Sequence, residues 1–233
     1  MQLSTKEESK IVLTGNWLTE STSRLQIAWF NAIAMNHKLP DSIRFMDGMS
    51  GKKYRNLINN LVGSTPDARY LEVGSWAGST ACSAIWGNSA KITCIDNWSE
   101  FGGPKQAFMS NVNSCLNDKI KFTFIEKDFR QVNYSNIGKY NIYMFDGPHS
   151  EQDQYDGIVI AQPALDDVFT LVVDDWNFPQ VRVGTERAIK DLSLNVIADI
   201  NILSHLDNGH PAIAGQNSDW HNGYYIAVVK KTM

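Results

Sequence analysis

The segment YLEVGSWAGST (Tyr70–Thr80) decides how the chain folds, because it has the pattern of a strand, a glycine turn and the start of a helix. Apolar residues dominate its first half, and the helix-forming run ACSAIW follows it. Gly74 and Gly78 lie four residues apart at the turn, directly after the acidic Glu72. Glycines at such a turn let a ligand approach the backbone closely. The segment therefore predicts a ligand site where a strand meets a helix, unless both glycines serve the turn alone.

The glycine spacing argues against a phosphate-containing ligand. A dinucleotide site requires G-x-G-x-x-G, and a phosphate loop requires G-x-x-x-x-G-K-[ST]; neither pattern is present. Glu72 would repel a phosphate and attract a cation or an amine. S-adenosylmethionine fits, because it carries an amino group and a sulfonium and no phosphate. The turn resembles the first motif of class I methyltransferases, E/D-x-G-x-x-x-G.

Short β-rich segments alternate with longer helical ones through most of the chain. Helical patterns cover 106–116 and 180–192. Strand, helix and strand in this rhythm predict an α/β fold, a Rossmann-like parallel sheet with helices on both faces. The predicted strands are 69–73, 91–96, 121–128, 140–146 and 169–175.

The two ends of the chain depart from that rhythm. Segments 195–203 and 224–231 have no helix between them, so we expect an antiparallel hairpin at the sheet edge, joined by the long 204–223 loop. Helical patterns cover 23–38 and 52–63, with Ser50 as a candidate cap of the second. We therefore predict an N-terminal helical cap region (1–63) and an S-adenosylmethionine-binding catalytic domain (64–233).

Acidic residues follow the second and third predicted strands. Open parallel sheets place a carboxylate at the end of the second strand, on a ribose diol, and Asp96 has that position. By resemblance, Asp128 would face the adenine amino group. Both acids could instead be turn or loop residues. The predicted cofactor-binding residues are Glu72, Gly74, Ser75, Gly78, Ser79, Asp96, Asn97, Asp128, Phe129 and Asp146.

A second acidic group follows the fourth and fifth strands, in YMFDGPHS and LVVDDWNF. Asp146, Asp174 and Asp175 would converge at one sheet edge, because adjacent strands lie about 5 Å apart. Three such charges repel one another unless a cation lies between them. An all-oxygen site suits Mg²⁺, Mn²⁺ or Ca²⁺, although Asp175 could instead cap a helix. His149 lies three residues after Asp146 and is a candidate base.

In this order of motifs the sequence resembles the metal-dependent O-methyltransferases, over roughly Arg69–Lys190. The broad relatives are the catechol and caffeoyl-coenzyme A enzymes, and the macrocin, mycinamicin and novobiocin sugar O-methyltransferases have the more similar pattern. The resemblance implies that Asp146, Asp174 and Asp175 hold Mg²⁺ (or Mn²⁺). It also implies that His149 and Asp146 are catalytic, although other members use a lysine. Pro148 departs from the family pattern.

Composition excludes several other functions. The formal net charge is −4 and no basic run is present, so we expect no nucleic-acid partner. No apolar run is long enough to span a bilayer, and the N-terminus lacks the apolar core of a signal peptide. The three cysteines form no C-x-x-C pair and are expected to be buried thiols, which favours a cytoplasmic location. A homo-oligomer remains an open possibility.

These features predict an S-adenosylmethionine-dependent O-methyltransferase that acts on a hydroxyl of a sugar or another small-molecule diol. The alternatives are a metal-independent class I methyltransferase and a nicotinamide-dependent oxidoreductase. Residues that could cover the site lie in the N-terminal helices, the 204–223 loop and the segment after the second strand. These residues are Trp17, Trp29, Phe30, Trp98, Phe101, Gly102, Gly103, His205, His210, Trp220 and His221.

Overall fold

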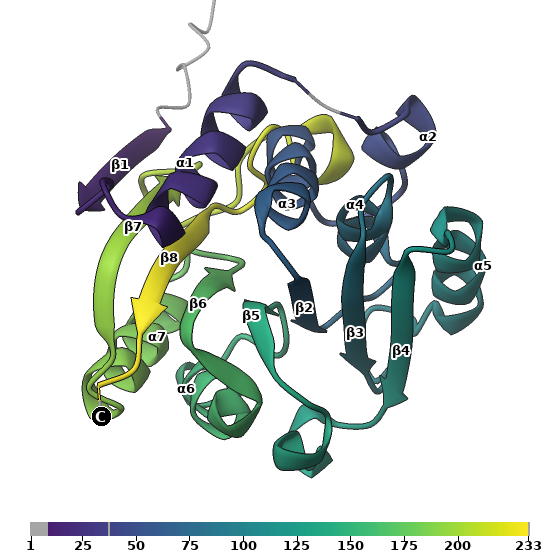
Figure 1. The fold of residues 1–233 in the computed structure, drawn as a ribbon. Helices are drawn as coiled ribbons and strands as arrows, with labels where there is room; N and C mark the ends of the chain where they lie inside the picture. Colours follow the sequence, from purple (N-terminus) through teal and green to yellow (C-terminus); the bar gives the residue numbers. More distant parts are fainter. Residues whose placement is uncertain (1–8, 37, 233) are drawn as a thin grey trace, which may run out of the picture.

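The computed structural model describes residues 9–36 and 38–232, which form one eight-stranded mixed sheet with helices on both faces (Figure 1). The strand order is β1-β7-β8-β6-β5-β2-β3-β4. This confirms the predicted α/β, Rossmann-like fold of class I methyltransferases. The strands are β1 (Lys10–Gly15), β2 (Ala68–Val73), β3 (Ala90–Asp96), β4 (Ile120–Glu126), β5 (Tyr140–Phe145), β6 (Leu165–Val173), β7 (Asn195–Leu203) and β8 (Tyr224–Lys230).

Five neighbouring strands, β6, β5, β2, β3 and β4, run parallel. Five of the six residues of β5 and four of the six in β2 are apolar or aromatic, and five of the six in each strand are buried, which matches strands covered on both faces. Their carboxyl ends therefore meet at one edge of the sheet. The chain order reverses between β2 and β5, so this edge has the crevice in which open α/β sheets bind ligands.

The predicted hairpin is present, but it does not form the sheet edge. β8 lies between β6 and β7 and is antiparallel to both. β1, which the sequence analysis did not predict, pairs antiparallel with β7 and forms the outer strand. The N-terminal segment therefore contributes a strand as well as helices.

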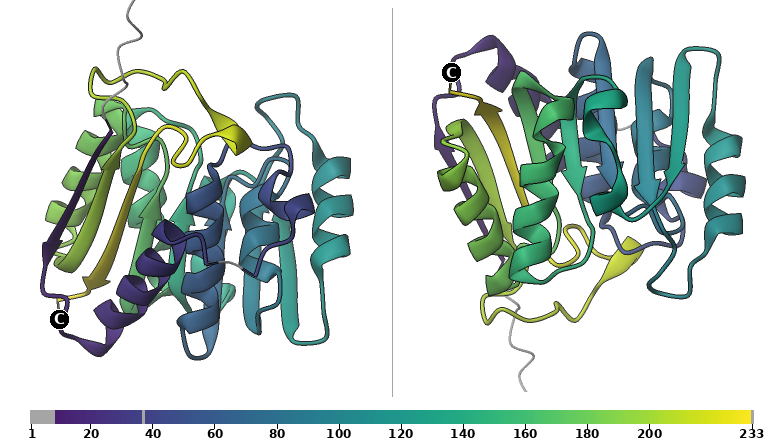
Figure 2. Two further views of the ribbon diagram at one scale, coloured as in Figure 1. Left: turned by 90° about the horizontal axis from the view of Figure 1, so that it is seen from above. Right: turned by 90° about the horizontal axis from the view of Figure 1, so that it is seen from below.

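Helices cover the sheet on two sides, and each side has its own apolar core (Figure 2). One core packs α1, α3, α4 and α5 against the sheet, and the other packs α6 and α7 against the opposite face. The helices are α1 (Glu20–Ile33), α2 (Asp41–Arg44), α3 (Lys52–Ser64), α4 (Ser79–Ile85), α5 (Lys105–Cys115), α6 (Glu151–Ala161) and α7 (Pro179–Asp191). Short 3-10 turns occur at η1 (Phe129–Gln131), η2 (Tyr134–Asn136), η3 (Gln162–Ala164) and η4 (Gly215–Asn217).

The predicted N-terminal cap region, residues 1–63, lies partly outside the described residues. Within it, Thr19 caps α1 with a reciprocal capping box. The helix therefore begins at Glu20, three residues before the predicted start at residue 23. Gly51, not Ser50, is the N-cap of α3, and the Ser50 side chain bonds elsewhere. None of the described helices combines the length and apolar character that crossing a bilayer requires. Cys82, Cys94 and Cys115 are buried free thiols.

Candidate functional site

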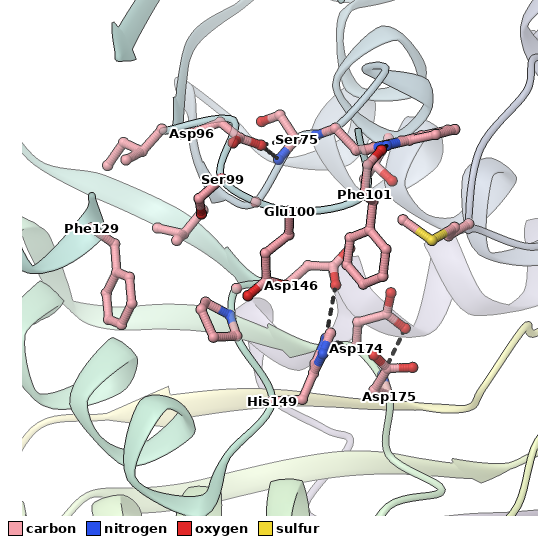
Figure 3. A pocket seen from close by; sticks show the side chains of 18 of the residues that line it. Ser75, Asp96, Ser99, Glu100, Phe101, Phe129, Asp146, His149, Asp174 and Asp175 are labelled. Carbon is pink, nitrogen blue, oxygen red and sulfur yellow. Dashed lines mark hydrogen bonds and ion pairs between the residues drawn. The ribbon is translucent and has the colours of Figure 1, made fainter. Parts of the chain in front are cut away.

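A cavity of about 420 Å³ lies at the carboxyl edge of the parallel strands (Figure 3). The glycine turn after β2 and the acidic segments after β5 and β6 all contribute to its wall. Of the residues proposed from sequence, Glu72 and Gly78 do not line it. Those that do are Gly74, Ser75, Ser79, Asp96, Asn97, Asp128, Phe129, Asp146, His149, Asp174 and Asp175.

The two glycines of the turn are required by neighbouring protein atoms. Gly74 has φ +82°, and a Cβ added there would lie 1.8 Å from the backbone oxygen of Asp146. Gly78 has φ +88°, and its Cβ would lie 3.0 Å from the Phe108 ring. The turn therefore packs backbone to backbone against the segment that leaves β5. The close approach that the sequence analysis assigned to a ligand is, at Gly74, made by Asp146.

Asp96 organises the glycine turn. Its Oδ2 accepts hydrogen bonds from the backbone N–H groups of Ser75, at 2.8 Å, and Trp76, at 3.0 Å. Its Oδ1 accepts from the N–H of Trp98 at 2.8 Å. The carboxylate thus holds three amides of the cavity wall in fixed positions. The ribose contact predicted for Asp96 stays a prediction.

Glu72 lies beneath the turn and is fully buried. The Tyr70 hydroxyl donates to Glu72 Oε2 at 2.6 Å. Burial raises the pKa of Glu72 from its ordinary value of 4.5 to about 7, although the hydrogen bond from Tyr70 opposes the rise. Glu72 does not line the cavity, and its predicted attraction for the amine of the donor stays a prediction.

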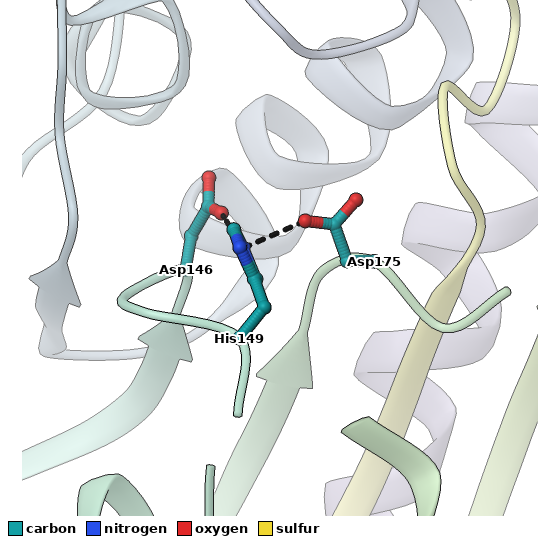
Figure 4. A group of neighbouring side chains, drawn as sticks. All are labelled: Asp146, His149 and Asp175. Atoms are coloured by element: carbon teal, nitrogen blue, oxygen red, sulfur yellow. Dashed lines mark ion pairs between the residues drawn. The ribbon is translucent and has the colours of Figure 1, made fainter. Parts of the chain in front are cut away.

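His149 lies between two carboxylates at the other end of the cavity (Figure 4). Its Nε2 is 2.6 Å from Asp175 Oδ2 and 3.6 Å from Asp146 Oδ1. Burial alone would lower the pKa of His149, but the hydrogen bonds and charges of the two acids outweigh it and raise the pKa to about 10. The imidazole is therefore protonated at neutral pH and partly neutralises the acids.

Asp174 and Asp175 follow β6 with their side chains in different surroundings. Asp175 has φ +57°, a conformation that L-residues adopt at a cost and that often marks functional sites. Its Oδ1 accepts from Asn222 Nδ2 at 2.6 Å. Asp174 Oδ1 accepts from the N–H of Asp175, and burial, with the charges of Asp146 and Asp175, raises the pKa of Asp174 well above its ordinary value. The pair is thus held rigidly, with one carboxyl favouring its neutral form.

The donor set fits a hard divalent cation. One ligand atom from each of Asp146, His149 and Asp175 lies within 4.8 Å of the others. Asp174 lines the same cavity and completes the predicted carboxylate trio, although it lies outside this group of three. Carboxylate oxygens suit Mg²⁺ or Mn²⁺, whereas the protonated His149 has no lone pair at Nε2 for an ion until it loses its proton. Burial, with the charges of Asp146 and Asp175, raises the pKa of Asp174, and a cation bound beside it would favour its ionised form.

The cavity walls contain residues that the sequence analysis did not propose. Met49 and Ser50 precede α3, and Phe178 and Gln180 come from the start of α7. No motif marks these positions; only their place beside the carboxyl edge would have identified them. Other lining residues not proposed from sequence are Trp76, Thr80, Ser99, Glu100, Lys127 and Asn222.

The residues expected to cover the site divide into two groups. Trp98 and Phe101 line the cavity, together with His210 and His221 of the 204–223 loop. The others do not line it, and Trp29 stacks on Trp220 with ring centroids 5.3 Å apart. The loop is anchored to the start of α3, where the backbone N–H of Lys52 donates to Ser218. Those that do not line the cavity are Trp17, Trp29, Phe30, Gly102, Gly103, His205 and Trp220.

Comparison with known proteins agrees with this fold. Residues 71–176 match the family model described as "Methyltransferase domain", a range that spans the glycine turn and the whole acidic group. No curated protein matches the sequence significantly. Similar solved structures are 13–15% identical to this chain, a level that supports the fold alone.

Three of these structures illustrate the range. TomG, an O-methyltransferase from Streptomyces achromogenes solved with S-adenosylmethionine, is 13% identical with a TM-score of 0.54, over 91% of this chain and 90% of its own. A candidate RNA methyltransferase from Pyrococcus horikoshii is 15% identical, with a TM-score of 0.52, over 93% and 100%. TrmN from Thermus thermophilus is 13% identical with a TM-score of 0.52, over 77% of this chain, which spans about half of TrmN (48%).

Proposed function

We propose that this protein methylates a hydroxyl oxygen of a small acceptor. The domain match and the fold support the broader activity, that of an S-adenosylmethionine-dependent methyltransferase. The acceptor is a sugar or another small-molecule diol, and Mg²⁺ or Mn²⁺ assists the reaction. This proposal is narrower than the domain match, because methyltransferase domains act on many kinds of acceptor.

One observation carries the proposal: the acids and the histidine share a single cavity with the glycine turn. Asp146, Asp175 and His149 lie together at one end, and Ser75, whose N–H Asp96 holds, lies at the other. Methyl transfer requires an oxygen nucleophile in line with the S–CH₃ bond of the donor. A site that deprotonates an oxygen beside a donor pocket is what such a reaction requires.

The chain's own residues supply the alignment and the proton acceptor. Asp96 fixes the amides of the turn, so the donor end is organised before any ligand binds. His149 is the proposed acceptor of the hydroxyl proton, and Asp175, at 2.6 Å, orients its ring. His149 must first lose its own proton, because the two acids raise its pKa to about 10.

Asp146, Asp175 and Asp174 are the proposed ligands of the cation. A divalent ion bound there would neutralise these acids, lower the pKa of His149 and of a bound hydroxyl, and hold the acceptor in place. Metal and base therefore belong to one proposal, since two of the acids that would hold the ion, Asp146 and Asp175, also raise the pKa of His149.

The charge of the cavity supports a small neutral acceptor over a nucleic acid. Among the described residues that line it, six are carboxylic acids and Lys127 is the one lysine or arginine. Nucleic-acid sites depend on lysine and arginine contacts to phosphates. This distinguishes the proposal from an RNA methyltransferase of similar fold. The six acids are Asp96, Glu100, Asp128, Asp146, Asp174 and Asp175.

A second candidate is a metal-independent methyltransferase. His149 already lies between Asp146 and Asp175 and supplies a positive charge to both. In that case His149 and Asp175 would act as a pair, without any ion, and Asp146 would help to hold the ring. The nicotinamide-dependent alternative loses its support, because the matched domain is a methyltransferase domain.

The deciding experiment measures S-adenosylhomocysteine formation from S-adenosylmethionine with a panel of sugars, glycosides and catechols. Each reaction is run in EDTA, and then with Mg²⁺ or Mn²⁺ added in excess. We expect turnover on a diol that vanishes in EDTA and returns with the ion. Full activity in EDTA would favour the metal-independent candidate, and methylation of RNA but of no small diol would overturn the proposed acceptor.

A further inference from the structure

Arg55 is a buried cation that the proposed chemistry does not use. It belongs to α3, and its side chain is 0% exposed. Its Nη1 donates to the backbone oxygens of Ile43, Arg44 and Met46, at 2.9, 3.2 and 2.7 Å. Its Nη2 donates to the oxygen of Gly48 at 3.4 Å. Among the described residues, none of the ion pairs includes Arg55, so carbonyl groups hold its charge.

The carbonyls that Arg55 binds belong to the segment that leads into the cavity. This segment, residues 43–48, immediately precedes Met49 and Ser50, which line the wall. It lies outside residues 71–176, the range of the matched domain. The cavity is therefore not complete within the matched domain, because the N-terminal region supplies part of its wall.

Arg55 also reaches the glycine-turn side of the cavity through a serine pair. Arg55 Nε donates to Ser50 Oγ at 2.9 Å, and Ser50 Oγ lies 3.0 Å from Oγ of Ser79, the first residue of α4. A Cβ added to Gly48 would lie 2.3 Å from Ser79 Oγ, so the two segments are in close contact. This chain of contacts joins α3, the N-terminal segment and the helix that follows the turn.

Donor and acceptor roles give this chain a direction. A guanidinium only donates hydrogen bonds, so Ser50 Oγ must accept from Arg55. The single hydroxyl proton of Ser50 is therefore free to point toward Ser79 or into the cavity. A hydrogen bond from a charged donor also makes that hydroxyl a stronger donor itself.

We propose that Arg55 is a positioning residue for the donor pocket: acting through Ser50, it fixes Ser79 and closes the pocket with the N-terminal region. This inference rests on the proposed use of S-adenosylmethionine, but on neither the metal nor the acceptor. Binding of S-adenosylhomocysteine to the full-length protein is therefore sufficient to test it.

The test is a double-mutant cycle on the dissociation constant of S-adenosylhomocysteine, measured by isothermal titration calorimetry. We expect Ser50→Ala and Ser79→Ala each to weaken binding about fivefold, the scale of one hydrogen bond. Because both act through one contact, the double variant should lose about five- to tenfold, not about 25-fold. Ser50→Thr, which keeps a hydroxyl, should retain most of the wild-type affinity for S-adenosylhomocysteine.

Arg55→Lys tests the cation itself. Lysine keeps the charge but cannot bond the same set of carbonyls. In the wild-type background, we expect Arg55→Lys to weaken the binding of S-adenosylhomocysteine about fivefold. In the Ser50→Ala background, the same substitution should weaken binding by less than a further twofold. An equal loss in both backgrounds would mean that Arg55 supports the fold alone and would overturn the proposal.

Asn59 provides the matched control. It lies on the same helix, is fully buried, and donates to Ser83 and Trp86 oxygens at the far end of α4, at 2.9 and 2.8 Å. Asn59→Ala should lower the melting temperature and leave the dissociation constant unchanged. Equal weakening of binding by Asn59→Ala would overturn the proposal.

Two further outcomes remain separable. If Arg55→Lys does not fold, the cycle between Ser50 and Ser79 decides alone: additive losses overturn the proposal, and non-additive losses support it. If the wild-type protein does not bind S-adenosylhomocysteine, the inference fails together with the proposed function, whereas binding with additive losses defeats the inference only.

Discussion

The two ends of the cavity hold their acidic residues in opposite ways. At the glycine turn, three backbone N–H groups satisfy the carboxylate of Asp96. After β5 and β6, Asp146, Asp174 and Asp175 crowd together, and His149 is the one cation in direct contact with them in the described structure. Backbone dipoles fix the first end, whereas the second depends on a group that can gain or lose charge.

Under the proposed function, this difference assigns donor binding to the first end and proton transfer to the second. An acid that is satisfied by the backbone has no need of a ligand, so it can hold a pocket in shape at all times. Acids that repel one another respond to whatever cation is present, and this sensitivity is useful where protons must move. The following substitutions, each with its own measurement, test that division.

Gly74→Ala should disrupt both ends at once. The added Cβ would lie 1.8 Å from the Asp146 oxygen, at a φ of +82°. We expect S-adenosylhomocysteine binding to be lost and the free energy of unfolding to fall by more than about 3 kcal/mol. Thermal melting and calorimetry measure both effects.

The control is Gly102→Ala, which has a similar φ of +78° with nothing within 4 Å of the added Cβ. It should lower the free energy of unfolding by only the cost of placing alanine in a left-handed backbone conformation, about 1–2 kcal/mol. Binding of S-adenosylhomocysteine should be unchanged. Similar losses from both variants would show that backbone conformation, and not the contact with Asp146, explains the requirement for glycine.

Glu72→Gln should change the pH dependence of stability. The folded-state pKa of Glu72, about 7, lies above its ordinary value of 4.5, so the folded protein retains a proton that the unfolded chain has released. This contribution to stability is complete below about pH 4.5 and is lost as pH rises through 7. Glutamine does not titrate, so the variant should gain stability relative to the wild type across that range, approaching about 3 kcal/mol at pH 8.

Urea unfolding at several pH values between 4.5 and 8 measures this difference. Tyr70→Phe is the companion variant, because it removes the hydrogen bond that opposes the rise in pKa. Its stability should fall more steeply with pH than that of the wild type. A Glu72→Gln difference that stays constant with pH would mean that Glu72 is ionised throughout.

His149→Ala should separate the two ends. Turnover should fall about 10²-fold, the usual scale for loss of a general base, while S-adenosylhomocysteine binding stays within about twofold. Binding is spared because the amides held by Asp96 do not depend on the histidine. Unchanged turnover would assign the proton to another group, and a parallel loss of binding would contradict the division between the ends.

Asp174→Asn should give the smallest effect, on the protein without added metal. Burial, with the charges of Asp146 and Asp175, raises the pKa of Asp174 well above its ordinary value, so folding requires this carboxyl to take up a proton that the unfolded chain has released, at a cost in stability. An uncharged amide of the same shape should raise the melting temperature in EDTA by about 2–4 °C, the equivalent of about 1 kcal/mol. A lower melting temperature would show that Asp174 makes a stabilising contact as a carboxylate.

Local pattern was sufficient to predict the central sheet but not the outermost strand. The parallel strands could be predicted because burial on both faces makes them apolar runs. β1 has no such mark, since all six of its residues are exposed. Its ladder comes from β7, and the contact of Thr14 with Asp199 spans 185 residues. Pairing over that distance leaves no periodic signal in the sequence.

The candidate site shows the same limit. Asp96, Asp146 and Asp175 could be proposed because parallel strands bring their carboxyl ends to one edge. Ser50 could not, because its contacts with Arg55 and Ser79 arise from the packing of α3 against α4, and no motif in the sequence marks them. The place of His149 between two acids depends on distances that strand order does not specify.

The contact between Gly74 and the Asp146 carbonyl also bears on how such a protein can diversify. The donor turn and the acidic segment meet through main-chain atoms, and the N–H of Asp146 additionally donates to the Val73 oxygen at 2.9 Å. Side chains elsewhere on the wall, such as Met49, Phe178 and Gln180, take no part in this junction. Under the proposed function, substitutions at these positions would reshape the cavity while leaving the distance between the glycine turn and the acidic segment unchanged.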